Sequence, residues 1–147
     1  MPNMKPWLSK SAEVLRAQIN ESFADRKRAS DGWIADLRHQ KAGKSDHIPD
    51  SKTGCVRAID IDAGLSDQKG ISAYLADQLR QYAKNTGRIS YIIHLGQIAS
   101  PILNWKWRRY RGFSPHNHHI HISFKSSVDN DKSPFVGIPL LGSKDEK

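Results

Sequence analysis

Residues 115–124 of this 147-residue chain read PHNHHIHISF, and they hold four of its seven histidines. From His119 onward polar and apolar side chains alternate, and the apolar positions are isoleucine or phenylalanine. This alternation predicts a β-strand with one face in a core. His119 and His121 would then lie together on the other face. His116 precedes the strand, where a loop could fold it over that face. The cluster indicates a metal site, and a solvated polar face is the alternative.

The composition is that of a globular domain with an excess of positive charge. The chain has 23 Lys and Arg against 15 Asp and Glu, which gives a net charge of +8. Such a balance favours polyanionic partners: nucleic acid, an anionic membrane surface or an acidic cell-wall polymer. The length suits one domain over residues 1–147, which we expect to be monomeric. The single cysteine, Cys55, excludes an internal disulfide, and its small neighbours predict burial.

Membrane and export signals are absent from the sequence. No apolar run approaches the roughly 20 residues that span a bilayer, so we expect no stable membrane insertion. The first residues, MPNMKPWLSK, lack the apolar core of a secretory signal. We therefore expect a protein made in the cytoplasm, whose export would need outside help.

Apolar periodicity predicts the remaining elements. They are helices over 11–23 and 69–86, a loop over 41–54, and strands over 55–62, 89–95, 97–99 and 119–124. Ser11 is the predicted N-cap of the first helix, and Gly87 ends the second. The expected fold is α+β, with a small antiparallel sheet that carries the metal site and two or three helices packed on it. Residues 11–125 would form its core, and 126–147 a polar tail whose apolar part could pack as a flap.

Two further residues could complete a metal site. A catalytic zinc ion takes three protein ligands, commonly His with Asp or Glu, and keeps a fourth position for water. His47 lies in the loop before the 55–62 strand, and Asp60 lies on that strand. If this strand neighbours the histidine strand, His47, Asp60 and His121 can meet around one ion. From spacing alone, Asp60 is either such a ligand or a solvent-facing residue at a strand end.

Several motifs in a fixed order carry a family resemblance. They are SDHIPD at 45–50, GCVRAIDI at 54–61, Tyr91-x-Ile93, Trp107-x-x-Tyr110-x-Gly112 and His116-x-x-His119-x-His121-Ile122-Ser123. Together they resemble phage endolysins and related bacterial proteins of the zinc D-alanyl-D-alanine peptidase group, whose fold is shared with the hedgehog signalling domain. Arg26-x-Arg28-x-Ser30-Asp31-Gly32 and His39 are similar to the phage subgroup. The resemblance covers roughly residues 20 to 124.

The resemblance implies which residues bind the metal and which residues take part in catalysis. One Zn²⁺ would be held by His47, Asp60 and His121. His119 would support the bound water or the transition state, and His116 would be the general base where many relatives have a glutamate. Residues 48–59 make a longer spacing between the first His and the Asp than in many relatives, which leaves Asp62 as a rival ligand.

Other candidates serve the substrate rather than the metal. By their position relative to the zinc motifs, Arg26 or Arg28 could stabilise the oxyanion, although charged turns are usually only solvated. Trp105, Trp107 and Tyr110 could form an aromatic wall beside the substrate, or they could belong to the core.

The expected function is that of a zinc metallopeptidase that cleaves peptidoglycan stem or cross-bridge peptides. The resemblance implies a phage or prophage endolysin whose partner is bacterial peptidoglycan, held in the host cytoplasm until its release to the cell wall. No nucleic-acid partner is expected. The alternatives are a basic nucleic-acid-binding protein or nuclease, and a metal-bearing but inactive binding module. The letters His-Asn-His at 116–118 do not favour a nuclease, because the residues of that motif are spread over a ββα element.

Overall fold

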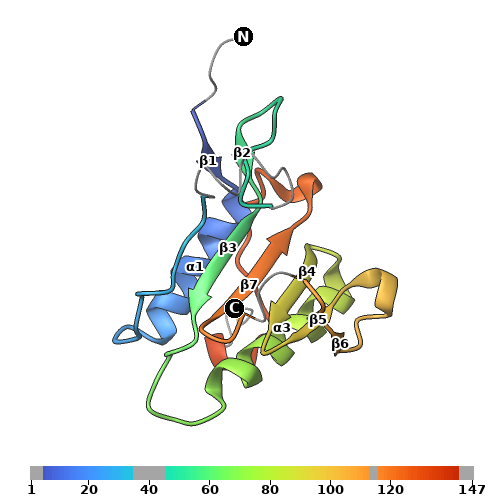
Figure 1. Cartoon of the computed structure of the whole chain (residues 1–147). Helices are drawn as coiled ribbons and strands as arrows, with labels where there is room; N and C mark the ends of the chain where they lie inside the picture. Colours follow the sequence, from blue (N-terminus) through green and yellow to red (C-terminus); the bar gives the residue numbers. More distant parts are fainter. Residues whose placement is uncertain (1–4, 35–45, 113–115, 143–147) are drawn as a thin grey trace.

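The computed structural model describes residues 5–34, 46–112 and 116–142 (Figure 1). Within them the fold is α+β, as predicted. The α-helices are α1 (Lys10–Ser22) and α3 (Ile71–Thr86), and the strands are β1 (Trp7–Leu8), β2 (Cys55–Val56), β3 (Ala58–Asp62), β4 (Ile89–His94), β5 (Gln97–Ala99), β6 (Arg108–Arg109) and β7 (His119–Phe124). Short 3₁₀ turns cover Pro101–Leu103, Ser126–Val128 and Pro139–Leu141. No helix in these ranges is both long and apolar enough to cross a bilayer.

The main sheet has five antiparallel strands in the order β3-β7-β4-β5-β6. The predicted histidine strand is β7, and it lies between β3 and β4. Asp60 of β3 is directly opposite His121, which is in turn opposite Ile93 of β4. The histidine strand and the Asp60 strand are therefore neighbours, which is the condition for a shared site of His47, Asp60 and His121.

The predicted strand over residues 55–62 is divided at Arg57. Its first part, β2, pairs in parallel with β1, and its second part, β3, enters the main sheet. The Arg57 guanidinium binds Asp129 through two hydrogen bonds of 2.7 Å and Asp50 through one of 2.8 Å. Through these ion pairs Arg57, which lies between the two strands, connects the loop of Asp50 with the loop of Asp129. These two loops are far from each other in the sequence.

The sheet has one apolar face and a second face, which we call the functional face because the candidate site residues Asp60 and His121 lie on it. Directly opposed residues of neighbouring strands point to the same face. Across β3, β7, β4 and β5, the four opposed residues of one face are fully buried, namely Ile59, Ile122, Ile92 and Ala99. Helix α1 packs on β3 and α3 packs on β4 (Figure 1). The other face carries Asp60 and His121.

The two helices match their predicted ranges to within two residues. Helix α3 ends at Gly87, whose left-handed backbone (φ 71°) lets its N–H bond the Ala83 carbonyl. Helix α1 begins one residue early, so the prediction of Ser11 as N-cap was wrong, and Ser9 occupies that position. The Ser11 hydroxyl instead lies 3.0 Å from the Val128 carbonyl oxygen.

The C-terminal segment belongs to the core. Phe135 and Ile138 are fully buried, and Leu141 is nearly so. The Gln18 side chain binds both backbone groups of Phe135, donating to the carbonyl at 2.9 Å and accepting from the N–H at 2.7 Å. The Arg88 guanidinium lies 3.8 Å from the centre of the Phe135 ring. The core therefore extends beyond residue 125, and the expected polar tail is in part a packed segment.

Candidate metal centre

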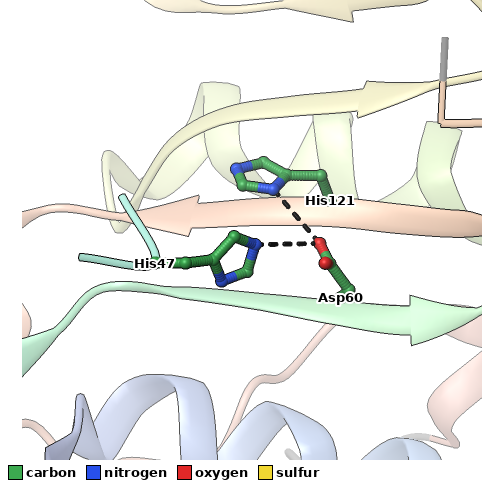
Figure 2. A group of neighbouring side chains, drawn as sticks. All are labelled: His47, Asp60 and His121. Carbon is green, nitrogen blue, oxygen red and sulfur yellow. Dashed lines mark hydrogen bonds and ion pairs between the residues drawn. The ribbon is translucent and has the colours of Figure 1, made fainter. Parts of the chain in front are cut away.

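Three side chains from separate parts of the chain converge on the functional face of the sheet. His47 comes from the turn before β2, Asp60 from the middle of β3 and His121 from β7 (Figure 2). Oδ1 of Asp60 lies 3.1 Å from Nε2 of His47 and 3.2 Å from Nδ1 of His121. One potential ligand atom from each residue lies within 4.8 Å of the others. We call these three residues the metal cluster.

The loop that carries His47 is fixed by contacts on both sides. The Arg57 N–H donates to the Asp46 carbonyl, and the Asp50 N–H donates to the Cys55 carbonyl. The Asp50 carboxylate accepts the backbone N–H groups of Lys52 and Thr53 and pairs with Arg57. The backbone bond from Lys52 and the Arg57 guanidinium lower the pKa of Asp50 to about 2. His47 is thus presented by a turn that is tied to the sheet.

Both imidazoles have a partner on the side away from the cluster. Nδ1 of His47 lies 2.8 Å from the Trp33 carbonyl oxygen, which can only accept, so Nδ1 carries a proton and Nε2 is the nitrogen that could offer a lone pair to a metal once it loses its own proton. Nε2 of His121 lies 2.8 Å from Oγ of Ser123, which leaves Nδ1 toward the cluster. Outer partners of this kind fix the tautomer and orientation of metal-ligating histidines.

The spacing and chemistry of the cluster fit a zinc ion. Ligands about 2.0–2.1 Å from a tetrahedral zinc ion are about 3.3 Å from one another. The two observed separations, 3.1 and 3.2 Å, are close to that value. Two imidazoles and one carboxylate are also a common donor set of catalytic zinc.

Asp60 and His47 of the metal cluster shift each other's pKa values. Burial lowers the pKa of His47, but the Asp60 carboxylate outweighs it, so the net shift of that pKa is upward. Burial favours the neutral form of Asp60, yet hydrogen bonds from His121 and His47 hold the pKa of Asp60 well below its usual range. A metal ion would therefore bind to an ionised carboxylate and compete with a proton on His47.

His116 and His119 lie beside the metal cluster, as predicted. Nε2 of His119 is 3.5 Å from Oδ1 of Asp60, and burial lowers the pKa of His119. The His116 ring is centred 4.9 Å from that of His119 and 5.5 Å from that of His121. The His116 backbone has φ 60°, and its carbonyl accepts hydrogen bonds from Leu95 and from Nδ1 of His94. The turn before β7 thus brings His116 over the functional face.

Asp62 has a different role from Asp60. Its carboxylate accepts the backbone N–H of Ser30 at 2.9 Å and that of Gly64 at 2.7 Å. It fastens two loops to the end of β3. Of the two aspartates that the sequence left as rival ligands, Asp60 is the one in the metal cluster.

Neither predicted arginine has a cluster residue among its hydrogen-bond partners. Arg26 is buried and binds Asp31 through two hydrogen bonds of 2.9 and 2.6 Å. Arg28 donates to Asn20 at the end of α1. Asp31 also accepts the backbone N–H of Asp62, so the Arg26–Asp31 pair supports the end of β3. His39, the remaining motif residue, lies outside the described residues.

The three aromatic residues that could have formed a wall beside the substrate lie in different surroundings. Trp105 is buried in the core, and Trp107 packs against the core while its indole N–H donates to Asp77 at 2.9 Å. Only Tyr110 approaches the site, with its ring centred 5.6 Å from that of His116. The aromatic-wall expectation therefore fails for Trp105, because the chain turns inward there.

The sequence reasoning assigned no role to Tyr91, which lies directly against the cluster. Its ring stacks on His121 with centres 5.4 Å apart and planes 15° apart. Its hydroxyl interacts with Ser123 and Asp46, and burial raises the pKa of Tyr91. The alternation of side chains along β4 could have identified Tyr91. Tyr91 and Ile93 are two residues apart and lie on the same face of the sheet as His121.

No family model matches the chain, and neither the curated proteins nor the solved structures include a match to it. The function has to be inferred from the site itself.

Proposed function

We propose that the protein is a zinc-dependent metallopeptidase that cleaves peptidoglycan stem or cross-bridge peptides. The convergence of His47, Asp60 and His121, with both imidazoles held from behind, is the observation that carries this proposal. The motif resemblance to the zinc D-alanyl-D-alanine peptidase group supports it. The specific fold that we propose is that of the same group.

The chemistry is a hydrolysis assisted by histidines. When bound, zinc lowers the pKa of a coordinated water toward about 7 and polarises the scissile carbonyl. His116 accepts a proton from the attacking water and returns it to the leaving amine. His119, whose pKa burial lowers, stays neutral near pH 7 and supports the developing negative charge by donating a hydrogen bond.

Tyr91 and Ser123 act as positioning residues. The Tyr91 ring stacks on the His121 imidazole, and its hydroxyl interacts with Ser123, the partner of His121 Nε2. Such outer contacts keep the ligand ring in one orientation and raise its basicity. Both residues contact His121, and neither belongs to the metal cluster itself.

The biological setting that we propose is that of a phage or prophage endolysin, made in the host cytoplasm and released to the wall. The net charge of +8 supports attraction to an anionic wall polymer. Electrostatic steering of this kind weakens as salt is added.

Digestion of purified peptidoglycan, with mass spectrometry of the released fragments, tests the activity and identifies the bond that is cut. We expect wild-type protein to release new amino termini from stem or cross-bridge peptides. His116→Ala should keep its zinc and lose turnover, while the exposed neighbour His118→Ala should keep both. Intact peptidoglycan after treatment with zinc-loaded wild-type protein would refute the proposal.

A further inference from the structure

The segment around β6 carries a group of exposed cations. Lys106, Arg108, Arg109 and Arg111 are all exposed. Within the described part of the chain, none of them has a hydrogen bond or an ion pair from its side chain. Arg57 and Arg88, by contrast, are each engaged by acidic groups. An edge strand that displays unpaired cations is suited to an anionic ligand.

One of these cations lies in line with the metal cluster. Strand register places five residues directly opposite one another across the sheet, and we call them the cross-strand row: Asp60, His121, Ile93, Ile98 and Arg108. Directly opposed residues share a face. Arg108 therefore projects on the face that carries the cluster, whereas Arg109 projects on the opposite face.

The spacing of the strands gives the distance between the metal cluster and the strand that carries Arg108. Neighbouring strands are about 4.8 Å apart, so the three steps from β7 to β6 span about 14 Å. About four residues of extended peptide cover that length. Exposure rises along the way: His121 and Ile93 are buried, Ile98 is half-buried and Arg108 is exposed. The row runs from a partly buried metal cluster to a charged and exposed edge.

Tyr110 lies close in sequence to Arg108, at one end of the cross-strand row, and close in space to His116, at the other end. It follows β6 by one residue, and its backbone N–H donates to the Gly96 carbonyl at 2.8 Å. Its ring is close to that of His116, beside the metal cluster. The β6 segment thus contacts the catalytic end of the face while it presents Arg108 at the far end.

From this placement we infer that Arg108 binds a carboxylate of an extended acidic peptide whose scissile bond lies at the metal cluster. The inference rests on the proposed peptidase function and adds to it the residue that recognises an acidic group of the substrate. A guanidinium can bind a carboxylate with two parallel hydrogen bonds, which gives direction as well as affinity. Arg108 would therefore determine which acidic peptides bind, and in which direction they lie across the sheet.

Equilibrium binding of a synthetic stem tetrapeptide, L-Ala–D-Glu–diaminopimelate–D-Ala, tests the inference. Calorimetry on zinc-loaded His116→Ala protein avoids turnover, and Arg108→Ala and Arg109→Ala are compared in that background. We expect Arg108→Ala to weaken binding on the order of tenfold, Arg108→Lys to restore part of it, and Arg109→Ala to stay within about twofold. Amidation of the peptide carboxylates should remove the difference between the two alanine variants.

Three results would overturn the inference. They are no binding of the acidic peptide, equal losses in Arg108→Ala and Arg109→Ala, and displacement of the peptide by a single-stranded oligonucleotide that binds through the same arginines. The last two would indicate a general polyanion surface. Cleavage of the tetrapeptide by wild-type protein is measured separately, so a failure of the proposed activity is distinguished from a failure of Arg108 to bind the carboxylate.

Discussion

Asp60 and His121 are directly opposed across β3 and β7, and Oδ1 of the aspartate lies 3.2 Å from Nδ1 of the histidine. This pairing fixes two of the proposed metal-ligating groups on adjacent strands of a sheet, where backbone hydrogen bonds hold them in place. The third group, His47, reaches the same oxygen from a loop. Two of the three proposed ligands are thus positioned by sheet register, and one by the contacts of a turn.

Asp60 and Asp62 are separated by one residue and should respond differently to the same substitution. Asp60→Asn removes the charged ligand, so zinc affinity should fall at least 100-fold while the fold is kept. Asp62→Asn should retain the metal and lower the free energy of unfolding by about 1–3 kcal/mol, since it weakens bonds to Ser30 and Gly64. Competition titration with a zinc chelator and urea unfolding measure the two effects. Equal zinc affinities of the two variants would contradict the ligand assignment.

Ser123→Ala tests the contact behind His121. Loss of the 2.8 Å hydrogen bond to Nε2 should weaken zinc binding by about 10- to 100-fold. Ser72→Ala is the matched control, because Ser72 makes a similar 2.9 Å contact with His94, a histidine that is not part of the metal cluster. If both variants bind zinc as the wild type does, the Ser123 contact does not tune the site.

The pH dependence of the metal-free protein should reveal His47. Its pKa is raised in the folded state, because hydrogen bonding and charge from Asp60 outweigh the effect of burial. The stabilisation from its charged form is complete below the ordinary histidine pKa of about 6.5 and is lost as pH rises through the folded-state pKa. Thermal unfolding of chelator-treated protein should show a decline in Tm over that window, and the decline should be absent from His47→Gln. A decline of equal size in both proteins would assign it to another group.

Phe135→Ala should be strongly destabilising, although the residue lies in the segment expected to be a polar tail or a flap. The ring is fully buried between Tyr82 and Phe124, so truncation should lower the free energy of unfolding by about 3–5 kcal/mol. Val136→Ala, at a neighbouring exposed position, should change it by less than about 0.5 kcal/mol. Chemical denaturation of both variants measures the contrast. Similar stabilities would mean that the segment does not belong to the core.

Local patterns in the sequence predicted the elements that depend on local physics. Alternation around Ile120 and Ile122 identified β7 within its observed bounds, and helical spacing through Leu75 and Leu79 identified α3. Parity alone placed His119 and His121 on one face. These features depend on residues close in sequence, where a period of two or 3.6 is informative.

The features that the sequence did not predict depend on distant contacts. Ser11 has the chemistry of an N-cap, but its hydroxyl lies near carbonyls more than a hundred residues away. Trp105 lies in a charged segment and is nevertheless buried. The meeting of His47, Asp60 and His121 also requires strand pairing, which spacing cannot specify. Residue chemistry offered that group on the condition that the two strands are neighbours, and the motif resemblance implied the same three ligands.

Zinc content is the most direct test of the central claim that His47, Asp60 and His121 form one metal site. Wild-type protein, loaded with zinc and dialysed against metal-free buffer, should retain about one zinc per chain by mass spectrometry of the metal. His118→Ala should retain the same amount, and His121→Ala should retain almost none while keeping its circular dichroism spectrum. Full zinc occupancy in His121→Ala, or none in the wild type, would contradict the account.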